Sequence, residues 1–255
     1  MAPLLRLHNV SKAFGELRAV DEVSFTVEQG SISGLIGPNG AGKTTLFNII
    51  AGIYAPDSGD IHLGQQRIEG RLPHRIFRAG LARTFQIPRP FPQMSVLENM
   101  MLAPLGQTGE RFWNNWFRPR RVAADERWQR AKAEEIIEFT GLTRVTHDPA
   151  RTLSGGQLKL LELARVLMSD PQVILLDEPA AGVNPALLRT LIEKIQALNQ
   201  RGYSFLIIEH NMDVVMSICN PIIAMAQGRV IFQGDSKAAR NDAALLDAYL
   251  GEVAH

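Results

Sequence analysis

Cysteine is nearly absent from this 255-residue sequence, which contains only Cys219. A single cysteine excludes an intramolecular disulfide framework and a metal site built from several cysteines. The sequence also lacks any run of about 18 or more apolar residues, so no segment is expected to span a bilayer. Residues 1–10 show no charged start followed by a long apolar stretch, so no secretory signal is expected. These absences favour a soluble globular protein of the cytoplasm.

Excess charge of one sign is missing as well. The chain carries 27 Lys and Arg residues and 26 Asp and Glu residues, which gives a formal net charge of +1. Proteins that bind nucleic acid or anionic membranes often carry a basic excess, so the composition favours neither class. Hydrophobic residues make up 45% of the sequence, which argues against a disordered chain.

Three short apolar stretches predict buried strands at Ser31–Ile36, Val173–Leu176 and Ser204–Ile208. They are continuous rather than alternating, which is typical of a parallel sheet covered on both faces. Helical patterns lie between them, at Thr44–Ala51 and after Asn184, which is a candidate N-cap. Strands that alternate with helices predict an α/β fold.

The middle of the chain has a different pattern. Ile87–Pro92 contains three prolines, which preclude a regular helix and favour an extended connection. The chain then becomes mostly helical, most clearly over Trp128–Phe139. We therefore expect a helical subdomain at about residues 89–165, inserted into an α/β core formed by about 1–88 and 166–255.

Residues 106–122 combine aromatic and basic side chains within one short stretch. They include Phe112, Trp113, Trp116 and Phe117 beside Arg118, Arg120 and Arg121. One interpretation is a contact with a membrane surface or a partner protein. The other is a long loop whose aromatic rings pack on the helices below it. We favour the packed loop, and the other interpretation stays open.

A phosphate-binding loop follows the first predicted strand. Gly37 to Thr44 read GPNGAGKT and fit the pattern G-x-x-x-x-G-K-[ST] between a strand and a helix. Backbone N–H groups of such a loop surround phosphates, Lys43 reaches the β- and γ-phosphates, and the Thr44 hydroxyl holds Mg²⁺. The candidate nucleotide-binding residues here are Gly37, Pro38, Asn39, Gly40, Ala41, Gly42, Lys43, Thr44 and Thr45.

Two carboxylates come directly after the second predicted strand. A carboxylate at the C-terminal end of a parallel strand lies where ligands of α/β sheets bind. Asp177 is suited to Mg²⁺, and Glu178 to activating the attacking water as a general base. Alone, such a pair is more often a solvated strand end or a helix cap, but the phosphate-binding loop favours the catalytic interpretation.

A second glycine motif, LSGGQ, precedes a helical pattern that runs from Leu158 to Met168. Its Ser154, Gly155, Gly156 and Gln157 predict another helix N-terminus that binds an anion. A small enzyme with one nucleotide needs only one such site. Two sites make sense if each nucleotide lies between two chains that contribute different motifs.

The phosphate-binding loop, LSGGQ and LLDEP, in this order, resemble the nucleotide-binding subunit of an ABC transporter over essentially the whole chain. The resemblance implies a P-loop NTPase (RecA-like) ABC ATPase core with the inserted helical subdomain and an N-terminal antiparallel β part. It implies a single ABC ATPase domain over 1–255 that binds ATP and Mg²⁺. It further implies a head-to-tail dimer, with itself or with a second ATPase, that encloses two ATP molecules.

The resemblance assigns roles to further residues. Gln86 matches the Q-loop glutamine, which contacts Mg²⁺ and the γ-phosphate, and His210 matches the switch histidine. Phe14 falls where an aromatic ring stacks on adenine, although core packing is the alternative. Ala181–Asn184 occupies the D-loop, where the family often has Asp in place of Asn184, so a role that depends on charge is in doubt there.

Longer strings narrow the resemblance further. ARTFQIPRPFPQMSVLENM, LDEPAAGVNP, IEHNMDVVM and AYLGE resemble ATP-binding proteins of branched-chain amino acid importers. This implies a peripheral subunit on the cytoplasmic face of the inner membrane that works with two permeases, a second ATPase and, indirectly, a solute-binding protein. Importers of urea or short amides and a lipopolysaccharide-export ATPase share similar strings, so the cargo stays open.

Two other classes of function stay open at this stage. A non-transport ABC ATPase acting on DNA or ribosomes usually carries two ATPase units or long coiled coils, and this chain has neither. A nucleotide-binding module with little hydrolysis would not need Glu178 and His210. We therefore expect ATP hydrolysis that powers transport, and no nucleic-acid partner.

Overall fold

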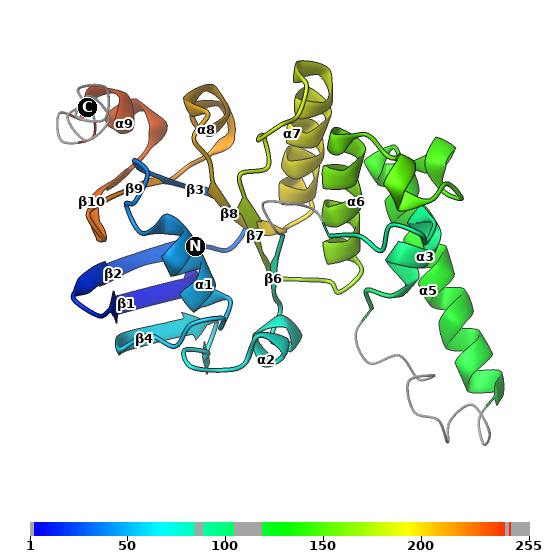
Figure 1. The fold of residues 1–255 in the computed structure, drawn as a ribbon, viewed down its shortest axis with the longest axis horizontal. Coiled ribbons are helices and arrows are strands. Elements are labelled where there is room, and N and C mark those ends of the chain that lie inside the picture. The colour runs from blue at the N-terminus through cyan, green and yellow to red at the C-terminus, as the bar shows by residue number, and fades with distance from the viewer. Residues whose placement is uncertain (1–2, 85–88, 105–118, 243–244, 246–255) are drawn as a thin grey trace. The chain divides into compact units, whose positions relative to one another are not determined.

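The computed structural model describes residues 3–84, 89–104, 119–242 and 245 (Figure 1). Contacts divide the chain into two units. The first comprises 1–86, 171–181 and 195–255, and the second 87–170 and 182–194. Residues 182–194, which the sequence assigned to the core, thus group with the helical unit. The subdomain boundaries given above remain predictions.

The first unit contains a six-stranded sheet in the order β10-β9-β3-β8-β7-β6. Neighbouring strands from β9 to β6 are parallel, and β10 is an antiparallel edge strand. The strands are β3 (Ile32–Ile36), β6 (Leu81–Arg83), β7 (Val173–Asp177), β8 (Ser204–Ile208), β9 (Ile222–Ala226) and β10 (Arg229–Gly234). Every residue of β3, β7 and β8 is buried. The three predicted strands and the α/β fold class are confirmed.

A second sheet in the same unit is antiparallel and has the order β2-β1-β4-β5. Its strands are β1 (Pro3–Phe14), β2 (Leu17–Glu28), β4 (Ser58–Leu63) and β5 (Gln66–Arg67). Buried and exposed residues roughly alternate along β2, as expected for a sheet with one face on a core. This sheet is the N-terminal antiparallel part that the resemblance implied.

Among the described residues of the first unit, short helices form at α1 (Lys43–Ile50), α2 (Pro73–Arg78), α8 (Met212–Ile218) and α9 (Ser236–Asn241). α1 lies within one residue of its predicted bounds. Its Leu46, Phe47, Ile49 and Ile50 are fully buried and join β3, β7 and β8 in one hydrophobic core. Packing in this core therefore holds α1 in the first unit.

The second unit is helical. It contains α3 (Val96–Met101), α5 (Pro119–Thr140), α6 (Gly155–Leu167), the first ten residues of α7 (Pro185–Gln200), and the 3₁₀ turns Thr143–Val145 and Ala150–Thr152. Asn184 caps α7 as predicted, because its Oδ1 accepts a hydrogen bond from Leu187 N at 3.0 Å. α6 begins at Gly155, three residues before the predicted start.

Residues 105–118, which hold most of the aromatic and basic segment, lie outside the described residues, and neither interpretation of that segment is tested. Across the parts of the chain that are described, no helix is both long and apolar enough to cross a membrane.

Candidate nucleotide-binding site

The predicted phosphate-binding loop joins β3 to α1, as its motif requires. Gly42, the residue before α1, has a φ of 96°, and a Cβ there would lie 2.2 Å from the carbonyl oxygen of Ala19. Only glycine fits this conformation and this close approach. Gly42 has no side chain that could accept a hydrogen bond from the first backbone N–H groups of α1. A helix N-terminus of this kind is suited to binding an anion.

A pocket of about 590 Å³ opens over this loop. It lies entirely within the first unit and brings together residues that are far apart in the sequence. Its lining comprises Leu17, Arg18, Ala19, Asn39, Gly40, Ala41, Gly42, Lys43, Thr44, Thr45, Glu178, His210, Gln227 and Gly228. The structure thus unites the loop, the candidate general base and the candidate switch histidine, which the sequence placed in three separate segments.

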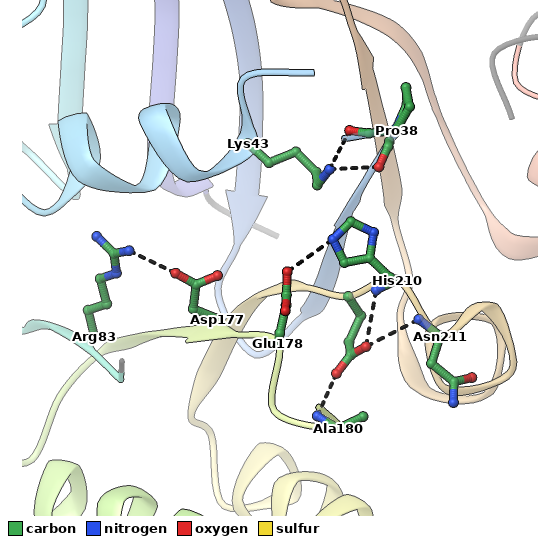
Figure 2. Close-up of polar contacts among 10 residues, drawn as sticks. Pro38, Lys43, Arg83, Asp177, Glu178, Ala180, His210 and Asn211 are labelled. Atoms are coloured by element: carbon green, nitrogen blue, oxygen red, sulfur yellow. Dashed lines mark hydrogen bonds and ion pairs between the residues drawn. The ribbon is translucent and has the colours of Figure 1, made fainter. Parts of the chain in front are cut away.

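Lys43 is folded back onto its own loop (Figure 2). Its Nζ donates hydrogen bonds to the carbonyl oxygens of Gly37, at 2.6 Å, and Pro38, at 2.8 Å. The side chain is buried, and an ammonium group in such a place needs acceptors. The loop carbonyls therefore satisfy the charge of Lys43 in this structure, and its contact with a phosphate remains a prediction.

Asp177 ends β7 and forms a buried ion pair with Arg83 of β6 (Figure 2). Nη2 of Arg83 lies 2.8 Å from Oδ2 of Asp177, and Nη1 lies 2.6 Å from Oδ1 of Asn48 in α1. The guanidinium also lies over the ring of Phe47. Arg83 thus fixes one oxygen of Asp177 and links two strands to α1. Arg83 was not among the predicted site residues, although it lies in the string ARTFQ, three residues before Gln86.

Glu178 follows Asp177 and lies against His210. Oε1 of Glu178 is 3.0 Å from Nε2 of His210, within hydrogen-bonding distance (Figure 2). Glu178 has a φ of 48°, which is rare for a residue with a side chain and clusters at functional sites. Its N–H donates to the carbonyl oxygen of Ile208 at 2.9 Å, which ties it to the end of β8. The two candidate catalytic side chains are therefore neighbours.

Phe14, the candidate adenine contact, ends β1, and its side chain is 44% exposed. Its ring lies 5.3 Å from that of Tyr54 in an edge-to-face arrangement. Asp57 accepts hydrogen bonds from Lys12 Nζ and Ala13 N, both at 2.7 Å, and so fixes the end of β1. These two bonds lower the pKa of Asp57. Phe14 is not among the described residues that line the pocket, and its contact with adenine remains a prediction.

The LSGGQ residues lie in the helical unit, at the start of α6. Oγ of Ser154 accepts from Gln157 N at 3.3 Å, and Oε1 of Gln157 accepts from Ser154 N at 2.9 Å, a reciprocal capping box. A Cβ on Gly156 would lie 2.4 Å from Cδ1 of Leu187 in α7. Glycine at 156 therefore lets the two helices approach closely. The contact of these residues with nucleotide remains a prediction.

Comparison with known proteins assigns the family. Residues 20–181, more than half of the chain, match the ABC transporter family. The chain belongs to the ABC transporter family. Membership implies that the chain binds nucleotide and hydrolyses ATP.

Relatives in the ABC transporter family align over almost the whole chain. A probable branched-chain amino acid transport ATP-binding protein of Archaeoglobus fulgidus, LivG, is 41% identical over 97% of this chain and 95% of its own length. The high-affinity branched-chain amino acid transport ATP-binding protein BraF of Pseudomonas aeruginosa is 38% identical over 98% and 99%.

Solved structures agree with this assignment. The ADP conformation of an ATP-binding cassette of an ABC transporter has a TM-score of 0.83 and 35% identity, covering 98% of this chain and 100% of the other. A nucleotide-free cassette has a TM-score of 0.82 and 35% identity, covering 97% and 99%. The predicted P-loop ABC ATPase fold is confirmed.

The Thr44 hydroxyl and the Asp177 carboxylate are hard oxygen donors of the kind that Mg²⁺ prefers. Thr44 lines the pocket, whereas Asp177 is not among the described residues that line it, and Mg²⁺ binding by these two residues remains a prediction. Gln86, the third predicted metal contact, lies outside the described residues.

Proposed function

We propose that this ABC protein hydrolyses ATP with Glu178 as the general base. The observation that carries the proposal is the 3.0 Å contact between Glu178 and His210 at the wall of the pocket over the phosphate-binding loop. Glu178 would take a proton from water while the water oxygen attacks the γ-phosphorus. The bond to the β–γ bridging oxygen breaks, and ADP and phosphate leave. His210 would orient Glu178 and contact the γ-phosphate.

The remaining site residues would bind the nucleotide. Lys43 would exchange its loop carbonyls for the β- and γ-phosphates, and loop N–H groups would bind phosphate oxygens. Thr44, Asp177 and Gln86 would hold Mg²⁺, which neutralises phosphate charge. Phe14 would stack on adenine.

A head-to-tail dimer would complete each site. Ser154, Gly155, Gly156 and Gln157 of one chain would contact the ATP bound to the loop of its partner, which is a second copy or a related ATPase. Because the closed dimer binds the shared nucleotide more tightly than the open one, ATP would favour closure and hydrolysis would favour opening.

The chain would power the import of branched-chain amino acids. The proposal is supported by the 37–41% identity, over nearly the full length, to ATP-binding proteins named for that transport. It would lie on the cytoplasmic face of the inner membrane, bound to two permeases, with a solute-binding protein delivering the cargo to them.

The test begins with purification of tagged protein from gently solubilised membranes. We expect two multi-span permeases and a second ATPase to co-purify. Reconstituted in vesicles with the solute-binding protein, the complex should take up labelled leucine only when ATP is present on the side of the ATPase. The matched control is the same complex carrying Glu178→Gln.

Each outcome has a distinct meaning. Uptake of urea or a short amide in place of leucine would contradict the cargo while supporting the transport function. Lipopolysaccharide extraction would contradict import. An ATPase that hydrolyses ATP without any membrane partner would instead support a non-transport ABC ATPase.

A further inference from the structure

Glu209, between β8 and His210, is buried, with only 3% of its surface exposed. Its carboxylate accepts three backbone hydrogen bonds. Oε1 accepts from Ala180 N at 2.6 Å, and Oε2 accepts from His210 N at 3.1 Å and Asn211 N at 3.2 Å. Figure 2 shows Ala180, His210 and Asn211 near one another, beside Glu178.

These bonds join two chain segments that are separate in the sequence. Ala180 lies two residues after Glu178, in the segment that follows β7. His210 and Asn211 lie in the segment that follows β8. One buried carboxylate therefore holds the backbone of both segments that carry the candidate catalytic side chains.

The backbone around Glu178 needs such support. Its φ of 48° is one that a residue with a side chain rarely adopts, and such conformations persist only where the surroundings impose them. The hydrogen bond from Ala181 N to the carbonyl oxygen of Glu178, at 3.1 Å, closes a turn after Glu178. The bond from Ala180 N to Glu209 anchors the same turn from outside.

We propose that Glu209 is a positioning residue that keeps Glu178 and His210 at hydrogen-bonding distance. The inference rests on the proposed function of those two residues. Glu209 is not among the described residues lining the pocket, so it acts through its neighbours and not on the nucleotide.

A carboxylate is suited to this position because both of its oxygens accept hydrogen bonds. Glutamine has the same shape but only one acceptor oxygen, and its NH₂ group would face an N–H donor. Glu209→Gln therefore removes the hydrogen bonds to one of the two chain segments, while the volume of the side chain changes little.

The predicted effect falls on turnover rather than on nucleotide binding. Lys43 and its loop carbonyls take no part in the Glu209 contacts. We expect Glu209→Gln to lower kcat about tenfold or more, because a small misplacement of a catalytic group is costly, and to leave the Kd for ATP within about twofold. Asp213→Asn, which removes an exposed carboxylate in α8, is the matched control and should change neither quantity.

Two further measurements separate positioning from a general structural role. In a His210→Ala background, Glu209→Gln should lower kcat by less than about twofold, because residues that act as a unit are not additive. In nucleotide-free protein, Glu209→Gln should shift the imidazole ¹⁵N resonances of His210, and Asp213→Asn should not.

The outcomes that overturn the proposal are distinct from failure of the proposed function. Equal loss of kcat in both backgrounds, unchanged His210 resonances, or a parallel loss of ATP affinity would contradict the positioning role. If Glu209→Gln does not fold, Glu209→Asp, which keeps two acceptor oxygens, is measured in the same way. If the wild-type chain binds ATP but does not hydrolyse it, the proposed function fails first.

Discussion

The guanidinium of Arg83 and the carboxylate of Asp177 form an ion pair with an Nη2 to Oδ2 distance of 2.8 Å, and their side chains are only 11% and 5% exposed. The two residues are 94 positions apart in the sequence and meet because β6 and β7 are parallel neighbours. A carboxylate proposed to bind Mg²⁺ is thus already held on one oxygen by the protein itself.

Replacing Arg83 should therefore destabilise the fold. Arg83→Met leaves the buried Asp177 carboxylate without its cation, and breaking a buried ion pair from one side costs about 3–5 kcal/mol. The measurement is denaturant unfolding followed by circular dichroism. Arg83→Met combined with Asp177→Asn should recover part of the loss, and additive losses would show that the two residues are not coupled.

Replacing Lys43 should weaken nucleotide binding. Lys43→Ala removes the ammonium group now held by the carbonyl oxygens of Gly37 and Pro38. A hydrogen bond to a charged group contributes about 1.5–3 kcal/mol, so we expect affinity for ATP to fall about tenfold to a hundredfold. Equilibrium binding of a fluorescent ATP analogue measures the change. Lys237→Ala, an exposed lysine of α9, is the control, and equal affinities for the two variants would contradict the assignment.

The glycines of LSGGQ should differ in their tolerance of a side chain. A Cβ on Gly156 would lie 2.4 Å from Leu187 Cδ1, whereas the nearest atom to a Cβ on Gly155 is the carbonyl oxygen of Gly182 at 3.9 Å. We expect Gly156→Ala to lower the free energy of unfolding by about 1–3 kcal/mol and Gly155→Ala to have little effect. Leu187→Ala should relieve the Gly156→Ala clash. Equal destabilisation by both alanines would refute the close approach.

The reactivity of Cys219 should depend on unfolding. Burial, and then the charge of Glu209, raise the pKa of this thiol to about 12. In the unfolded chain the thiol has a pKa of about 8.5. The native state is therefore stabilised by the neutral thiol fully below that pH. This stabilisation is lost as the pH rises from about 8.5 through the higher native pKa, because burial then opposes ionisation. At pH 8.5 a disulfide reagent should modify the native chain far more slowly than the chain in denaturant. Equal rates would contradict the buried position.

The sequence predicted those elements whose packing leaves a local pattern. β3, β7 and β8 are buried on both faces, so they appear as continuous apolar runs. α6 was predicted to begin at Leu158 but begins at Gly155. Gly155 and Gly156 have low helix propensity and so give no helical signal. The S-x-x-Q spacing of Ser154 and Gln157 is the capping signal that marks the true start.

Pairings between distant segments could not be predicted in the same way. Arg83 and Glu209 each stand beside a residue or string that the sequence singled out, but their partners lie in other strands and turns. Only the parallel order of β6, β7 and β8 brings those partners within hydrogen-bonding distance. The order of strands in a sheet cannot be predicted from the periodicity or spacing of residues within one segment.

The most direct test of the central claim is ATP turnover by Glu178→Gln, measured as phosphate release by the purified chain beside the wild type. General-base catalysis contributes about a hundredfold or more, so the variant should bind ATP as the wild type does and release phosphate at least about a hundredfold more slowly. A variant that releases phosphate at the wild-type rate would contradict the account, because Glu178 would then not activate the attacking water.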